Sequence, residues 1–537
     1  MSRWGMIANL ERCVGCQTCT AACKHTNATS PAVQWRKVLD IEMGEYPDVK
    51  RAFVPVGCMH CEDPPCMHVC PSTATKRRDD GIVTIDYDLC IGCAYCAVAC
   101  PYQARYKVDK PTKAYGKSGR MRHEAQREDP ARIGVAQKCT FCSDRIDYGL
   151  ENGLTPGIEP EATPACVNAC IAGALHFGDL DNPESNVSGM LDEYKTFRMH
   201  EELGTNPGFH YIWGHKDDEE PDSAAAEIIN GWSESHGVGG VGAAAPWLQQ
   251  HWDWRAAGNF ICGGTGTGLL IAMTLLSAFL PVPEFLPLVG LAFIGVGLFL
   301  VWLETGRPLR APLNVMFNPH TSWMTRESFL AIALMASGLA SAWFSSWPLL
   351  ILTGLFAIGF LYCQGRILKA SKGIPAWRMS EIVSLIFSTG LVEGTGLLLL
   401  LASFNMSNTA APVREGLGIG LMILLTLRAM LWNRYRSALK TGSPLATQKV
   451  INRFHPLWIF GGHLLPMVLF LTALILEPVA AYGAGAAGLI ALLAGWQMKF
   501  ILITRASYNQ GYAINHSPRR GSGQGGPGGK PGWETQS

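Results

Sequence analysis

One run of twelve residues constrains this chain more than any other feature. It extends from Cys90 to Pro101, reads CIGCAYCAVACP, and has the spacing C-x2-C-x2-C-x3-C-P. Three thiolates on one tight loop can bind one iron–sulfur cubane, whereas the fourth, which precedes a proline, ligates a different cluster. The run therefore predicts two clusters and requires a second cysteine run to complete both.

Three further cysteine runs follow a similar plan. Together the four runs use sixteen of the chain's 18 cysteines: Cys13, Cys16, Cys19, Cys23, Cys58, Cys61, Cys66, Cys70, Cys90, Cys93, Cys96, Cys100, Cys139, Cys142, Cys166 and Cys170. A disulfide framework does not need recurrent C-x2-C pairs, and zinc sites seldom use four cysteines in so short a run. Sixteen thiolates match four 4Fe–4S clusters with none left over.

The cysteine-rich half is predicted to fold as an α+β double ferredoxin-like domain, with two 2x4Fe-4S modules, over residues 1–180. The turn signal Asp79-Asp80-Gly81 precedes a short strand candidate at 82–86. The basic stretch 111–138, which includes Lys138, is interpreted either as a solvated surface loop or as a docking surface for a partner subunit. Residues 181–258 are predicted to be an extension and linker.

From about residue 259 the composition changes to apolar runs of membrane-spanning length. We predict eight spans, at about 259–280, 286–303, 328–344, 347–364, 381–403, 417–434, 456–477 and 482–504. Eight such runs leave no polar faces to enclose them as core helices. An all-α eight-helix transmembrane bundle is therefore expected over 259–506, followed by a Gly-rich tail, 507–537, that is expected to be disordered.

Charge in the loops predicts the orientation of this bundle. The loops after the second, fourth and sixth spans, together with the tail, carry sixteen Lys and Arg residues, whereas the opposite loops carry only Arg414. By the positive-inside rule, the cluster domain and both termini are expected on the cytoplasmic side of the inner membrane. The start of the chain shows no apolar signal segment, which agrees with this expectation. The formal net charge of +1 gives no case for nucleic-acid binding.

Four clusters in one domain can relay electrons from one to the next. The group in the bilayer that exchanges electrons with this relay is expected to be either a haem or a quinone. Transmembrane haem needs facing histidines, and His463 is the only one well inside a span, so a quinone is favoured and no haem is expected. Quinone chemistry also moves protons, and ionisable groups at membrane depth are functional hypotheses by default. The candidate quinone or proton site comprises Glu304, Arg307, Glu393 and His463, each of which can instead be a structural contact. Arg428 and Lys499 are further candidates within the spans. Each can instead be a side chain that snorkels toward the cytoplasm.

The four cysteine runs, including Cys58 to Cys66, resemble those of the four-cluster electron-transfer subunit of dimethyl sulfoxide reductase-type molybdoenzymes. Residues 259–515 resemble the eight-helix anchor subunit of the same enzymes, in the segments 306–308, 321–327, 374–377 and 504–511. The chain therefore looks like a fusion of two normally separate subunits, and it is most similar to those of the membrane-bound cytoplasmic sulfite dehydrogenases that use quinone.

The resemblance implies a nested ligation of the four clusters. The first three cysteines of the first run would share a cluster with Cys170, and those of the second run with Cys100. Cys70 would complete the cluster of the third run, and Cys23 would join Cys139, Cys142 and Cys166. The implied partner is a soluble, cytoplasmic molybdopterin catalytic subunit. Where related anchors can carry a histidine near the quinol, this chain has Glu304-Thr305.

These observations predict an electron-transfer and membrane-anchor subunit that links a catalytic subunit, expected to oxidise sulfite, to membrane quinone. An alternative is the same role in a dimethyl sulfoxide or other S- or N-oxide reductase, with electrons that run from quinol to the catalytic subunit. An ion-translocating complex and a stand-alone quinone-reactive ferredoxin are further alternatives.

Overall fold

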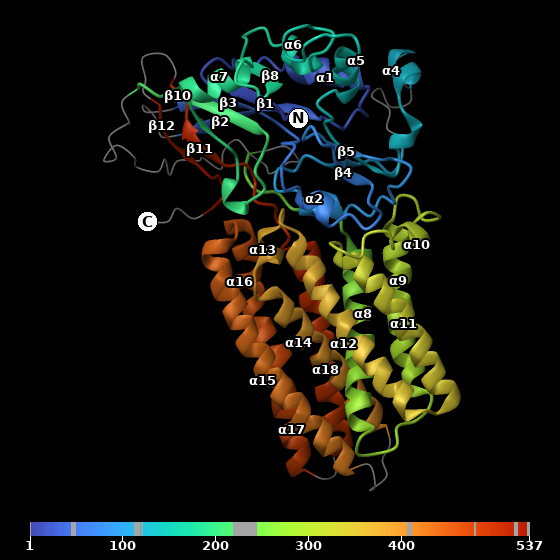
Figure 1. The fold of residues 1–537 in the computed structure, drawn as a ribbon. Helices are drawn as coiled ribbons and strands as arrows, with labels where there is room; N and C mark the ends of the chain where they lie inside the picture. The colour runs from blue at the N-terminus through green and yellow to red at the C-terminus, as the bar shows by residue number, and fades with distance from the viewer. Residues whose placement is uncertain are drawn as a thin grey trace. The chain divides into compact units, whose positions relative to one another are not determined.

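The computed structural model describes residues 2–43, 50–111, 119, 122–218, 244–404, 411–476, 480–519 and 525–533. These residues form two compact units (Figure 1). The first unit comprises Met1–Trp247 together with Asn509–Ser537, and the second comprises Leu248–Tyr508. The first is an α+β domain rich in cysteine and the second is helical, so the predicted fold class is confirmed.

A four-stranded sheet in the order β8-β1-β10-β9 forms the centre of the first unit. Strand β1 (Trp4–Asn9) is buried along its length, antiparallel to β8 (Leu175–Asp179) and parallel to β10 (Phe209–His215). Strand β9 (Tyr194–Phe197) pairs with β10 at the edge. Because β9 and β10 complete this sheet, the described part of the segment predicted as extension and linker belongs largely to the folded unit.

The first unit also contains four two-stranded antiparallel sheets, three of them hairpins of consecutive strands. They are β2 (Arg36–Met43) with β3 (Lys50–Gly57), β4 (Thr75–Arg77) with β5 (Val83–Ile85), β6 (Tyr106–Lys107) with β7 (Ala136–Gln137), and β11 (Ile514–Ser517) with β12 (Gly526–Gly529). Strand β5 lies within the predicted strand at 82–86, and the predicted turn precedes it. The last hairpin is formed where the Gly-rich composition predicted disorder. The His516 ring stacks on Trp213, with ring centroids 4.2 Å apart, and this contact helps to order the tail.

Short helices present the cysteine runs. The third cysteine of each run is the second residue of a helix: Cys19 in α1 (Thr18–Asn27), Cys66 in α2 (Pro65–His68), Cys96 in α3 (Tyr95–Ala99) and Cys166 in α6 (Ala165–Asn168). Free N–H groups in the first turn of a helix favour a thiolate. The other α-helices in the described part of this unit are α4 (Arg122–Arg127), α5 (Ser143–Glu151) and α7 (Asn186–Glu193).

The second unit contains eight helical spans that are long and apolar enough to cross a membrane. They are α8 (Trp254–Leu276), α9 (Leu286–Glu304), α11 (Trp323–Phe344), α12 (Trp347–Ala370), α14 (Ile382–Ser403), α15 (Ala411–Gly442), α16 (Leu445–Ile459) continued by α17 (Leu465–Ile475), and α18 (Ala480–Thr504). Each overlaps one predicted span, and Figure 1 shows them running alongside one another. Two short helices, α10 (Ala311–Asn314) and α13 (Pro375–Arg378), lie in the connections.

Glycines bring α14 into close contact with both α8 and α18. A Cβ atom on Gly394 would lie 1.8 Å from the carbonyl carbon of Gly268, and one on Gly396 would lie 2.6 Å from the carbonyl oxygen of Gly488. Small residues allow transmembrane backbones to approach in this way. The packing places side chains of α8, α14 and α18 next to one another in the interior of the unit.

Candidate functional site

The sixteen predicted cluster ligands gather into four groups in the first unit. Group I lines a small cavity of about 20 Å³ and consists of Cys13, Cys16, Cys19 and Cys170. Its members come from the first and last cysteine runs, which the central sheet brings together through β1 and β8. The four cysteines of one run therefore do not all belong to the same group. The fourth cysteine of one run joins the first three cysteines of another.

The other groups are recognised by the electrostatic effect of each thiol on its neighbours. Burial is the largest cause that raises the pKa of Cys23, and its neighbours raise it further in group II: Cys23, Cys139, Cys142 and Cys166. Burial and then the neighbouring thiols likewise raise the pKa of Cys61, which belongs to group III: Cys58, Cys61, Cys66 and Cys100. Burial and the neighbouring thiols also raise the pKa of Cys93, which belongs to group IV: Cys70, Cys90, Cys93 and Cys96. Each group thus combines three cysteines of one run with one cysteine of another.

A left-handed residue precedes the second cysteine of every run. These residues are Gly15 (φ 71°), His60 (φ 42°), Gly92 (φ 69°) and Phe141 (φ 55°). For a residue other than glycine this conformation is strained and persists where the surrounding structure enforces it. Such turns point successive backbone N–H groups into a concavity that binds anions, including iron–sulfur clusters. The loops therefore have a backbone suited to an anionic cluster.

The donor set also fits iron–sulfur clusters. All 18 cysteines lie in the described part of the chain, and none forms a disulfide. Burial raises the pKa of Cys66 to about 11 and that of Cys100 to about 12, so these thiols become thiolates only around a positively charged centre. Among the described residues no group of three or more His, Cys, Asp or Glu converges for a single metal ion. A cubane is larger than one ion and does not require such convergence.

The four groups follow one another in series. Cys19 of group I lies in electrostatic range of Cys166 of group II. Cys139 of group II is in range of Cys58 of group III. Cys66 of group III is in range of Cys96 of group IV. The order I–II–III–IV follows from these neighbours.

Known proteins are similar in sequence to the cysteine-rich part of this chain. Residues 49–129 match the family model described as a 4Fe-4S dicluster domain. The chain is 39% identical over 229 residues to the "Putative dimethyl sulfoxide reductase iron-sulfur subunit" of Halobacterium salinarum, an alignment that covers 40% of this chain and 80% of that protein. It is also 39% identical over 221 residues to a selenate reductase subunit of Mesobacillus selenatarsenatis (39% of this chain, 72% of that protein). It is 36% identical over 229 residues to a sulfite dehydrogenase subunit of Allochromatium vinosum (40% and 83%).

The chain belongs to the family of iron–sulfur subunits of dimethyl sulfoxide reductase-type molybdoenzymes. Membership of this family implies a catalytic subunit as a partner. The eight apolar helices that this iron–sulfur subunit carries in addition fit a fused membrane anchor and make it a multi-pass membrane protein.

Within the anchor of this iron–sulfur subunit, Glu393 forms a fully buried ion pair. Its Oε2 lies 2.6 Å from Lys499 Nζ, and both side chains are 0% exposed. Thr265 Oγ1 donates to the same oxygen at 3.2 Å and accepts a hydrogen bond from Trp496 Nε1 at 2.8 Å. Lys499 Nζ also donates to the carbonyl of Phe260 at 2.9 Å. Lys499 is thus a partner inside the bundle and does not snorkel.

Two glycines make room for this ion pair. A Cβ atom on Gly264 would lie 2.0 Å from Lys499 Nζ, and one on Gly495 would lie 2.6 Å from Glu393 Oε1. Glu393 Oε1 accepts no hydrogen bond from the described residues. A buried carboxylate oxygen of this kind can take a proton or a hydrogen bond from another group.

His463 lies in a π-helical turn, Phe460–Leu464, that interrupts the seventh span. Its Nδ1–H donates to the carbonyl of Trp458 at 3.1 Å, and its Nε2 accepts from Arg428 Nε at 3.3 Å. Arg428 is 0% exposed, donates to the carbonyl of Gly462 at 2.6 Å, and lies in electrostatic range of Glu393. Arg428 therefore holds the histidine ring, and the snorkelling interpretation is wrong for it.

The four predicted quinone or proton residues do not form one site. Glu304 is the buried last residue of α9, and Arg307 follows it in the connection to α11. Glu393 lies in the middle of α14, and His463 lies in the turn of the seventh span. Two polar regions therefore exist in the bundle, one at the end of α9 and one at the centre of α14.

A buried polar cluster that the sequence did not reveal lies toward the same ends of the helices as Glu304. Gln364 Nε2 donates to the carbonyl of Asn259 at 3.2 Å, and the buried Glu327 lies beside Gln364. Arg255 Nη1, four residues before Asn259, donates to the carbonyl of Leu303 at 2.9 Å, which joins this end of α8 to the end of α9. The feature of the sequence that could have indicated this cluster is Glu327, a carboxylate that lies one turn into an apolar span.

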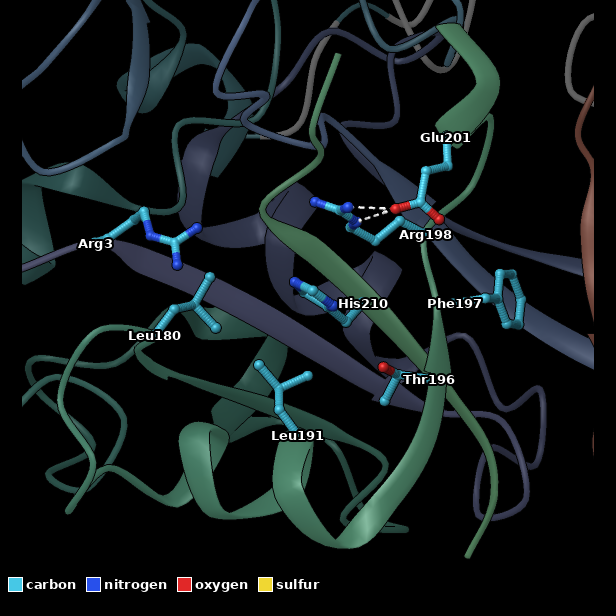
Figure 2. Close-up of a pocket in the computed structure, with 8 residues that line it drawn as sticks. All are labelled: Arg3, Leu180, Leu191, Thr196, Phe197, Arg198, Glu201 and His210. Carbon is cyan, nitrogen blue, oxygen red and sulfur yellow. Dashed lines mark hydrogen bonds and ion pairs between the residues drawn. The ribbon is translucent and has the colours of Figure 1, made fainter. Parts of the chain in front are cut away.

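The first unit also has a surface pocket of about 390 Å³ (Figure 2). Figure 2 shows Arg198 directed at Glu201, with which it forms an ion pair, beside His210. Arg3, on the opposite wall, is paired with Asp181 at 2.8 Å. Because both arginines already have carboxylate partners, we assign no cofactor to this pocket.

The predicted basic surface over 111–138 is only partly described, because residues 112–118, 120 and 121 lie outside the described residues. Within the described part, Lys138 is 1% exposed. It lies in the interior beside groups II and III, so it contributes to neither a solvated loop nor a docking surface.

Proposed function

We propose that this chain is the electron-transfer and membrane-anchor subunit of a molybdopterin oxidoreductase complex, and that it carries electrons between a cytoplasmic catalytic subunit and membrane quinone. One observation carries the proposal: a single chain combines four cysteine groups in series with eight apolar helices. Each group would hold one 4Fe–4S cluster, which exchanges one electron at a time. Groups I to IV would provide all sixteen ligands.

For quinone, we propose two polar regions of the anchor with different roles. Quinone reduction consumes protons as well as electrons, so the site needs groups that hold and release protons. Glu304 and Arg307, together with Glu327, would contact the headgroup. Glu393 and His463 would exchange protons, which is consistent with the available acceptor Oε1 of Glu393.

We further propose that the first unit faces the cytoplasm of the inner membrane, because of the sixteen Lys and Arg residues on that side. A cytoplasmic catalytic subunit favours sulfite as the electron donor. The alternative is reduction of dimethyl sulfoxide or another S- or N-oxide, in which electrons run from quinol. The direction of electron flow in the purified complex distinguishes the two.

Purification of the full-length chain from its native membrane tests the proposal. We expect a large molybdenum-containing subunit to co-purify, together with four 4Fe–4S signals in electron paramagnetic resonance (EPR). Glu304→Gln, Glu393→Gln and His463→Ala are expected to lower quinone turnover while all cluster signals remain. The exposed Glu415→Gln is the matched control. Absence of the molybdenum subunit would contradict the main proposal, and full turnover in all three variants would contradict the quinone assignment.

A further inference from the structure

In the described part of the chain, two arginines are buried among the cysteine groups without a carboxylate partner. Arg36 is 0% exposed and Arg105 is 3% exposed. Within the described residues neither forms an ion pair with Asp or Glu. Burial of an unpaired charge is costly, and a guanidinium does not deprotonate in proteins. Keeping two fixed positive charges in this interior therefore lowers the stability of the fold.

Arg105 lies between groups III and IV. Its Nη2 donates to Cys66 Sγ of group III at 2.9 Å, and its Nη1 donates to Thr75 Oγ1 at 3.1 Å. The same guanidinium lies in electrostatic range of Cys96 of group IV. One side chain thus contacts a sulfur of group III and acts electrostatically on group IV.

Arg36 has the equivalent position between groups I and II. It lies in electrostatic range of Cys166 of group II and of Cys19 of group I. Its Nη2 donates to Met6 Sδ at 3.0 Å, whereas Nε and Nη1 have no hydrogen-bond partner among the described residues. Two buried donors beside these cysteines can reach further acceptors, and cluster sulfur is an acceptor of this kind.

Lys138 lies at the remaining junction. Its Nζ donates to the carbonyls of Val83 and Cys139, the latter at 2.7 Å. It is 1% exposed and in electrostatic range of Cys139 of group II and of Cys58 of group III. Each of the three junctions in the order I–II–III–IV therefore contains one buried basic side chain.

We propose that Arg36 and Arg105 are positioning residues that set the reduction potentials of the relay, each for the two cluster sites that it joins. Reduction adds one electron and therefore one negative charge to a cluster. A fixed positive charge and an N–H···S hydrogen bond in a low-dielectric interior stabilise the reduced form and raise its potential. Because each arginine is close to two sites, it raises the potentials of both. The inference rests on the proposed four-cluster ligation.

The test is an EPR-monitored redox titration of membranes that contain the full-length chain, with dithionite as the reductant. Arg105→Gln is expected to lower the midpoint potentials of two clusters, each by at least a tenfold change in the reduction equilibrium, or about 59 mV for one electron. Arg36→Gln is expected to lower those of the other two. Arg105→Lys keeps the charge and should shift the same pair less. Arg51→Gln is the control, because it removes a charge of the same sign from a side chain that is 58% exposed.

Iron and sulfide content separates this inference from the proposed function. Fewer than four clusters in the unaltered chain would contradict the proposed function itself. Four clusters with unchanged potentials in Arg105→Gln and Arg36→Gln, or shifts no larger than in Arg51→Gln, would overturn only the inference. Loss of clusters from both neutral variants would also overturn it, in favour of a purely structural role.

Discussion

Removal of Lys499 is the most demanding test of the membrane unit. In Lys499→Met the Glu393 carboxylate keeps its place in the bundle but loses the ammonium that lies 2.6 Å away. At this distance, and with an effective dielectric constant of about 20, the attraction between two unit charges is about 6 kcal/mol. Part of it offsets the cost of burying both charges. Breaking such a buried pair costs about 3–5 kcal/mol, because one charge is left uncompensated.

The assay is thermal unfolding of the full-length chain in detergent, followed by the helical circular dichroism signal. A loss of 3–5 kcal/mol corresponds to a fall in Tm of roughly 6–20 °C for a domain of about this size. The double variant Glu393→Gln/Lys499→Met removes both charges, and it is expected to be more stable than Lys499→Met alone, because replacement of both members of a buried pair is often neutral. Lys440→Met, at an exposed position of α15, is the control.

Two outcomes would refute this reasoning. The first is a Tm for Lys499→Met within the range of the Lys440→Met control, which would mean that the buried pair contributes nothing. The second is a double variant whose destabilisation equals the sum of the two single variants, because charges in contact must be energetically coupled.

Three further predictions concern the first unit. Cys70→Ser is expected to alter the EPR signal of the cluster bound by the third cysteine run and to spare that of its own run; the reverse result would refute the grouping. Gly15→Ala should abolish one cluster signal, because its Cβ would lie 2.5 Å from the ring of Phe53 at a φ of +71°, whereas Gly153→Ala, at a φ of +70° with nothing within 4 Å, should retain all signals. Burial lowers the pKa of Lys37 to about 8, so between pH 8 and about 10.5 the unfolded chain binds more protons and stability should rise with pH. Thermal unfolding should lose this slope in Lys37→Met, and an identical slope would contradict the assignment.

The sequence by itself determined the cofactor class and the two kinds of unit. Ligand spacing within a cysteine run is a local property, because a tight loop must present three thiolates to one cluster. Membrane spans are local as well, since about 20 apolar residues in one helix satisfy their own backbone. For these reasons each predicted span overlaps an observed helix, and the runs can be read without a structure.

Only the tertiary structure decided which distant side chains meet. Glu393 and Lys499 are 106 residues apart, and no pattern near either residue indicates the other. Arg36 and Arg105 look like ordinary basic residues in the sequence, yet they are buried beside cysteines. Contacts of this kind depend on how helices and strands from remote segments pack. The packing determines which group each buried charged side chain contacts, and this contact determines the role of the side chain.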